Sequence, residues 1–167
     1  MFEALQARGH ALLGDQHAVH AVLRNAETNL ARSDSAEPPM WLTYFTEAEL
    51  AAHTAYCLRD LGHTQRVEPE ARSALTRYDP ALVRSRVFMH TVLAGARISV
   101  QRPDLEGACA EAGHALHLVK NVRSTRGTEH LAGFVHSLEP FQTHPVARNF
   151  IERASETLNG STPGHPT

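Results

Sequence analysis

Residues 61–78 read LGHTQRVEPEARSALTRY, and this stretch decides the fold. Gly62 is suited to the left-handed backbone conformation that ends a helix. Small or apolar residues then follow at steps of four, three and four, namely Val67, Ala71, Ala74 and Tyr78. This spacing places them on one face of an α-helix. The stretch therefore predicts a tight turn followed by an amphipathic helix.

The same pattern occurs twice more along the chain, each time after a turn residue. The corresponding positions are Val19, Leu23, Ala26 and Leu30 after Gly14, and Ala108, Ala112, Ala115 and Val119 after Pro103. Equivalent positions lie 48 and then 41 residues apart, and recurrence at such intervals is typical of helical repeat proteins. The alanines at the repeated positions would let neighbouring helices approach closely, so we interpret them as packing residues.

A second amphipathic stretch precedes each turn. These stretches cover Phe2 to Leu13, Glu47 to Leu61 and Leu82 to Ile98, and each is long enough for three or four helical turns. A fourth pair is predicted over Thr128 to Leu138 and Val146 to Leu158. The expected fold is all-α, a right-handed solenoid of antiparallel, tetratricopeptide-like helix pairs with about seven to eight helices.

One repeat domain is expected over residues 1–159. Its units span about residues 1–32, 46–79, 81–122 and 126–158. Ser33 to Pro39 is polar and contains proline, which predicts a loop. Residues 160–167 contain two glycines, two prolines and no large apolar residue, so we expect a disordered tail.

Two residues in the second unit lead to predictions about where its helices begin. Pro69 falls inside the second helix of that unit and removes a backbone hydrogen bond, so the helix is either kinked or begins near Glu68. Thr46 is the expected N-cap of the preceding helix, with Glu49 as its capping-box partner. Pro145 is placed at the first turn of the last helix.

Composition and charge exclude several classes of protein. The net charge of -2 does not suit a domain that neutralises DNA phosphates. No apolar run reaches membrane-spanning length, and no secretory signal is evident at Met1. The two cysteines, Cys57 and Cys109, form no CxxC pair and are interpreted as packing residues rather than as a redox switch. We expect a cytoplasmic protein that binds neither membranes nor nucleic acid.

Twelve histidines are the most unusual count in the composition. His17 with His20, and His114 with His117, are spaced as metal ligands on a helix can be. No HExxH motif and no third ligand at fixed spacing accompanies either pair, so no metal site is predicted. Motifs for a serine nucleophile or for a phosphate-binding loop are also missing from the sequence. We therefore predict neither an enzyme nor a cofactor.

Aromatic and polar residues on the first helix of each pair are the candidate binding residues. Those helices line the concave face of a helix-pair solenoid, where peptides bind. The aromatic run Trp41 to Phe45 is interpreted either as a hydrophobic anchor or as part of this surface. The candidates for partner binding are Trp41, Tyr44, His53, Tyr56, Arg86, His90 and Arg97.

The run from Trp41 to Arg77, above all Trp41 to Leu50 followed by Leu61-Gly62, resembles the C-terminal tetratricopeptide-like region of actinobacterial XRE-type helix-turn-helix regulators. The third unit continues the resemblance at Val83 to Arg86, Leu105 to Cys109 and Ala115-Leu116, and His144 to Ala147 is similar to the terminal helix of that family. The resemblance implies a protein- or peptide-binding, sensing or oligomerisation module of a bacterial transcriptional regulator.

The main departure from that family lies at the start of the chain. Met1 stands almost at the first repeat helix, so we expect this chain to lack the regulators' DNA-binding domain. The alternative is a stand-alone tetratricopeptide-like adaptor that is unrelated to transcription. In either case the expected partner is a protein or peptide, and a homo-oligomer is a further option.

Overall fold

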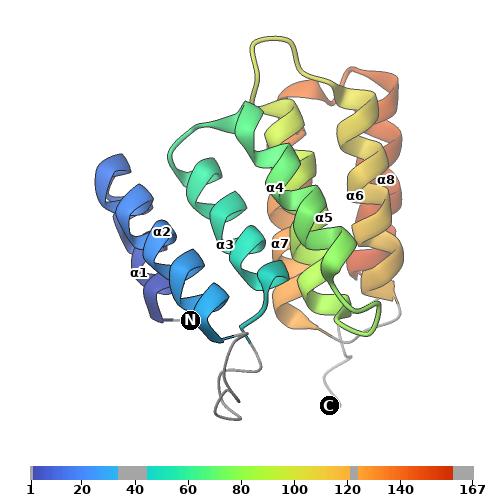
Figure 1. Ribbon diagram of the computed structural model, residues 1–167. Coiled ribbons are helices and arrows are strands. Elements are labelled where there is room, and N and C mark those ends of the chain that lie inside the picture. The colour runs from blue at the N-terminus through green and yellow to red at the C-terminus, as the bar shows by residue number, and fades with distance from the viewer. Residues whose placement is uncertain (1, 34–44, 121–123, 160–167) are drawn as a thin grey trace, which may run out of the picture. The chain divides into compact units, whose positions relative to one another are not determined.

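The computed structural model describes residues 2–33, 45–120 and 124–159 of the chain (Figure 1). These residues form eight α-helices and one short 3-10 helix, with no β-strand among them. The predicted all-α class is therefore confirmed. Trp41, Tyr44, most of the predicted loop at 33–39 and the tail at 160–167 lie outside the described residues.

The helices lie within a few residues of the predicted positions. They are α1 Phe2–Leu12, α2 Gln16–Ser33, α3 Glu47–Asp60, α4 Thr64–Arg77, α5 Val83–Ile98, α6 Leu105–Lys120, α7 Thr125–Ser137, η1 Glu139–Phe141 and α8 Pro145–Asn159. Ser33 ends α2, so the predicted start of the loop at this residue is wrong. Pro145 is the first residue of α8, where its missing N–H has no helical acceptor to lose.

Contacts between helices group into two compact units, Met1–Tyr78 and Asp79–Thr167, where the sequence predicts one domain over 1–159. In the first unit α1 packs against α2 and α3, and α3 packs against α2 and α4. In the second unit α5 packs against α6 and α7, while α8 packs against α6 and α7. Helices that are adjacent in the sequence thus form tightly packed pairs, α1 with α2, α3 with α4 and α5 with α6.

The repeated small residues occupy the predicted buried positions. The alanines of this register are at most 2% exposed, and they are Ala26, Ala71, Ala74, Ala108, Ala112 and Ala115. The turns before α2 and α4 contain Gly14 and Gly62 at φ values of 75° and 76°. Only glycine adopts this backbone conformation without strain, which explains the glycine at each turn.

The N-terminal ends of α3 and α4 test the predictions made for Thr46 and Pro69. The Glu49 N–H donates to the Thr46 hydroxyl at 3.4 Å, which confirms Thr46 as the N-cap of α3. Helix α4 begins at Thr64 and contains Pro69, so the alternative start near Glu68 is wrong. Pro69 cannot donate to the carbonyl of Gln65, but both residues are exposed, and water can satisfy that carbonyl.

Each unit has its own apolar core. The core of the first unit joins small residues of α1 to larger ones on α2 and α3, including Val19, Leu23 and Leu50. The core of the second unit contains Leu131, Phe134 and Phe150. Among the described residues, no helix combines the length and the apolar character that a membrane span requires.

Candidate functional site

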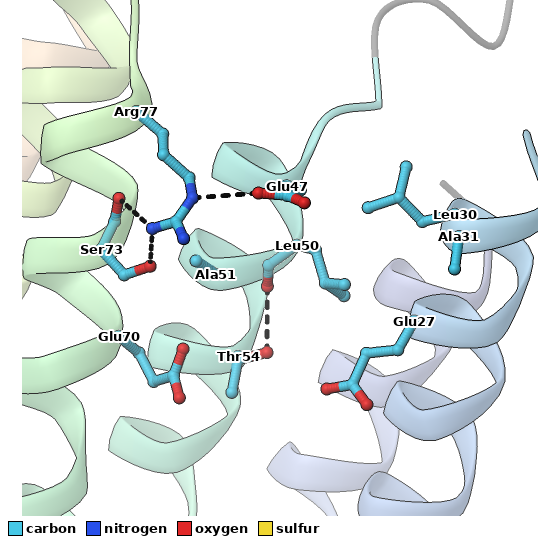
Figure 2. A pocket seen from close by; sticks show the side chains of 10 residues that line it. All are labelled: Glu27, Leu30, Ala31, Glu47, Leu50, Ala51, Thr54, Glu70, Ser73 and Arg77. Atoms are coloured by element: carbon cyan, nitrogen blue, oxygen red, sulfur yellow. Dashed lines mark hydrogen bonds and ion pairs between the residues drawn. The ribbon is translucent and has the colours of Figure 1, made fainter. Parts of the chain in front are cut away.

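A groove of about 360 Å³ opens in the first unit between α2, α3 and α4 (Figure 2). Helix α3 forms its floor, and α2 and α4 form its two walls. The lining residues are Glu27, Leu30 and Ala31 of α2, Glu47, Leu50, Ala51 and Thr54 of α3, and Glu70, Ser73 and Arg77 of α4. The floor and the α2 wall therefore mix apolar and polar residues, and the α4 wall is polar.

One end of the groove is organised by Arg77. Its Nε donates to Glu47 Oε2 at 3.1 Å, and its Nη1 donates to the Ser73 carbonyl at 3.3 Å and to the Ser73 hydroxyl (Figure 2). On the floor, the Thr54 hydroxyl donates to the Leu50 carbonyl at 2.9 Å, which turns this polar group back onto its own helix. The guanidinium at this end is thus already engaged by groups of the groove itself.

The remaining carboxylates of the groove are those of Glu27 and Glu70. They point toward each other from opposite walls (Figure 2). Burial raises the pKa of Glu70, and the negative charge of Glu27 raises it further, while Arg66 and Arg77 act in the opposite direction. Glu70 would therefore be stabilised in its charged form by any cation that entered the groove. This arrangement suits a ligand with a basic group next to an apolar one.

His53 and Tyr56, the predicted candidates on α3, do not line this groove. The His53 ring lies 6.2 Å from the Phe45 ring and 6.1 Å from the Tyr56 ring, measured between centroids. Burial lowers the pKa of His53, and the charge of Arg8 lowers it further. Phe45 is buried in the core of the first unit, which agrees with the anchor interpretation for this residue.

Tyr56 is the centre of a charged cluster that joins α1 to α3. The Arg8 guanidinium lies 4.7 Å and the Arg59 guanidinium 5.4 Å from the centre of its ring. Asp60 accepts hydrogen bonds from Arg59 at 2.9 Å and 2.6 Å and forms an ion pair with Arg8 at 3.6 Å. Burial raises the pKa of Tyr56 to about 12. These contacts hold two helices together and leave the ring buried.

His90 of α5, a further candidate, is paired with a buried carboxylate of α6. Its Nδ1 lies 3.1 Å from Glu111 Oε2, and its ring lies 5.2 Å from the ring of His114. Burial lowers the pKa of His90, Glu111 raises it, and the charges of His114 and Arg86 lower it. Arg86, also a candidate, therefore belongs to the same electrostatic cluster, which links α5 to α6.

Arg97 lies near the C-terminal end of α5 and is separate from the His90 cluster. Its Nη1 forms an ion pair with Asp104 Oδ2 at 3.4 Å. The Asp104 Oδ1 accepts the Gly107 N–H at 2.8 Å, which caps the start of α6. A Cβ at position 107 would collide with both side chains, so glycine leaves room for this ion pair. Arg97 thus connects the end of α5 to the beginning of α6.

The lowered pKa of His90 predicts a dependence of stability on pH. The unfolded state takes up a proton near the ordinary pKa of about 6.5, whereas the folded state does so only at lower pH. The free energy of unfolding is therefore expected to fall as the pH decreases below about 6.5, until the folded-state pKa is passed.

Urea denaturation across this pH range measures the effect. His90→Gln should make the pH dependence shallower and leave the part that the lowered pKa of His53 contributes, whereas His17→Gln, a change at an exposed position, should leave it as in the wild type. An unchanged slope in His90→Gln would exclude His90 as the source.

The positions of the histidine pairs and of the cysteines bear on metal binding and on thiol reactivity. Within the described residues, which include His17, His20, His114 and His117, no cluster of three or more His, Cys, Asp or Glu side chains could hold a metal ion. The two thiols are buried and unbonded. Burial raises the pKa of Cys57 to about 11 and also raises that of Cys109, so both favour the protonated form.

The sequence prediction missed the two carboxylates of the groove. Glu27 follows the buried Ala26 by one position, and Glu70 precedes the buried Ala74 by four. On a helical wheel these offsets place them on opposite flanks of the same repeated apolar face. Helices α2 and α4 occupy equivalent places in successive helix pairs, and α3 lies between them. Opposite flanks of α2 and α4 therefore face each other across α3. The signal was therefore present, but it becomes visible only when two helices are compared.

Comparison with known proteins adds no relative: no protein-family model matches the chain, and neither a curated protein nor a solved structure matches it.

Proposed function

We propose that the chain is a binding module and that the groove over α3 receives a protein segment with a basic side chain next to an apolar one. The observation that carries this proposal is the pair Glu27 and Glu70, which point toward each other across the part of α3 that lines the groove. The floor includes Leu50 and Ala51, which can pack against an aliphatic side chain. The proposal assigns no catalysis to the chain.

Electrostatics favour a cation over an anion or a neutral group in this place. Three carboxylates and one guanidinium line the groove, and the guanidinium of Arg77 is already bonded to Glu47. An arginine side chain is the best match among basic groups because its flat guanidinium can bond to carboxylates on two sides. Its aliphatic stem would lie along Leu50 and Ala51 of the floor.

The proposal includes a finer description of the fold. Helix pairs joined by short turns, with alanines buried at repeated positions, support a tetratricopeptide-like, right-handed stacking of the pairs. Together with the resemblance of residues 41–77, this supports a role as the partner-binding or sensing part of a cytoplasmic XRE-type transcriptional regulator. The alternative role is that of an adaptor unrelated to transcription. In either role the groove over α3 binds the partner.

Peptide binding tests the proposal directly. Two fluorescent, end-blocked peptides would be compared that differ at one central position, arginine in one and glutamine in the other, each flanked by leucines. We expect the arginine peptide to bind at least about tenfold more tightly, which corresponds to about 1.4 kcal/mol. In the double variant Glu27→Gln, Glu70→Gln this preference should disappear, measured by fluorescence anisotropy.

Glu156→Gln is the matched control, because Glu156 is an exposed glutamate of α8 in the second unit. This variant should keep the full preference for arginine. Equal binding of the two peptides by the wild type, or a preserved preference in the double variant, would contradict the proposal.

Affinity capture from cell lysate with the wild type and the double variant distinguishes the regulator role from the adaptor role. Transcription factors that only the wild type retains would favour the regulator.

A further inference from the structure

The groove over α3 has an acidic end. Arg77 bonds to Glu47 at 3.1 Å, so the C-terminal end of α4 lies beside the N-terminal end of α3, and these two helices run in opposite directions. At the other end of the groove, Glu27 and Glu70 point toward each other, and Thr54 lies between them (Figure 2). We call Glu27, Thr54 and Glu70 the acidic layer.

A second layer of the groove is apolar. It consists of Leu30, Ala31 and Leu50, which lie together on the side of α2 (Figure 2). Leu30 and Ala31 follow Glu27 by three and four positions, and Leu50 precedes Thr54 by four. At a rise of 1.5 Å per residue, the two layers are therefore about 4.5–6 Å apart along the groove. A ligand must present its basic and its apolar group at a similar distance.

We propose that the ligand of this groove is an extended protein segment in which an arginine and an aliphatic residue stand two positions apart. In an extended chain such residues point to the same side and lie about 6.6–6.8 Å apart, a difference that the long arginine side chain can take up. The arginine then reaches Glu27 and Glu70, and the aliphatic side chain contacts Leu30 and Ala31. This inference rests on the function proposed above, because it describes the ligand of the same groove.

Adjacent residues of the ligand cannot fill both layers. In an extended chain, successive side chains point to opposite sides. An aliphatic residue next to the arginine would therefore point away from Leu30 and Ala31 while the guanidinium contacts the acidic layer. The layered lining thus selects the spacing of the two side chains as well as their chemistry.

The size and the lining of the groove favour an extended chain over a helix. Its volume of about 360 Å³ is spread over the seven residues from Glu70 to Arg77, about 10 Å of helix, which gives a mean cross-section of about 35 Å². A helix with its side chains is about 10–12 Å across and needs more than twice that area. Helices that bind in grooves also use apolar anchors over two turns, whereas one layer of this groove is acidic.

Peptides of identical composition test the spacing. The first, Leu-Ser-Arg-Ser-Leu, carries leucines two positions from the arginine, and the second, Ser-Leu-Arg-Leu-Ser, carries them next to it. Both are symmetric about the arginine, so the result does not depend on the direction in which the chain runs. We expect the first peptide to bind at least about fivefold more tightly, since partial burial of a leucine supplies this much. Fluorescence anisotropy of end-blocked, labelled peptides measures it.

Leu30→Gln tests the composition of the apolar layer. Glutamine keeps the length of the side chain and a similar helix propensity but removes the apolar contact. The variant should lose the preference for the first peptide over the second and keep the preference for arginine over glutamine in the ligand. Leu12→Gln is the matched control, because Leu12 is a 71% exposed leucine of α1 outside the groove, and it should keep both preferences. Circular dichroism checks that both variants remain helical.

A third peptide tests the helical alternative. It is rich in alanine, so that it favours a helix, and carries leucines four positions on either side of the arginine. Tightest binding of this peptide, or equal binding of the first two, would overturn the extended arrangement and leave the function of the groove intact. A preference for the first peptide that survives in Leu30→Gln would also overturn it. If the wild type binds none of the three arginine peptides, both this inference and the proposed function are wrong.

Discussion

Replacement of Ala74 or Ala115 by arginine is expected to unfold the helical unit that contains it at ambient temperature. Both alanines are fully buried, one in each unit. Overpacking costs about 1–3 kcal/mol, and an unpaired buried charge costs several kcal/mol more. Because a whole domain has only about 5–15 kcal/mol of stability, the loss is comparable to the total. Thermal denaturation followed by far-ultraviolet circular dichroism measures it.

Arg72→Ala provides the control for this experiment. Arg72 is exposed on α4, and its Nε pairs with Glu68 one turn earlier at 2.8 Å. Such a pair on a helix surface contributes about 0.3–0.5 kcal/mol, so the melting temperature should change by only a few degrees. If Ala74→Arg and Arg72→Ala shift the melting temperature equally, the repeated register is wrong.

Phe150→Ala is expected to destabilise the second unit by about 3–5 kcal/mol. Phe150 is 1% exposed and meets the Phe134 ring edge-on, with centroids 5.7 Å apart at 76°. Its removal leaves a cavity between α8 and α7 and breaks an aromatic pair, which itself contributes about 0.5–1.5 kcal/mol. Urea denaturation of the variant and the wild type measures the difference in the free energy of unfolding.

Two further substitutions serve as comparisons for Phe150→Ala. Phe141→Ala, at a half-buried position of η1, should cost clearly less because solvent already reaches that ring. Phe150→Leu should recover most of the stability, since the leucine fills much of the cavity. Similar losses for Phe150→Ala and Phe141→Ala would show that Phe150 does not hold the second core together.

The sequence predicts the helices well because their signals are local. Gly62 ends one helix, and Ala71 and Ala74 lie on the buried face of the next, all within one short stretch. Each of these positions depends on backbone conformation or on the period of one helix. Of the two alternatives for Pro69, a kinked helix or a helix that begins near Glu68, the second is wrong, because Pro69 lies on an exposed side of α4 that tolerates the missing hydrogen bond.

The candidate site is harder to predict because it depends on pairs of helices. His53, Tyr56 and His90 are polar residues at positions where a ligand could bind, yet each is largely covered by neighbouring side chains. Rings with polar tips readily bury their apolar parts, so residue type alone does not distinguish packing from binding. Glu27 and Glu70 look like ordinary solvated residues until α2 and α4 are seen on either side of α3.

The two buried cysteines allow the opening of each unit to be measured by thiol labelling. Each unit contains one buried thiol, Cys57 in the first and Cys109 in the second, and burial holds both in the unreactive protonated form. Modification by a thiol reagent must therefore wait for the surrounding helices to open. Comparison of the two labelling rates measures opening separately in each half of the chain. If both rates change in the same way with denaturant concentration, the chain opens in one cooperative transition, and if they change differently, it opens in two.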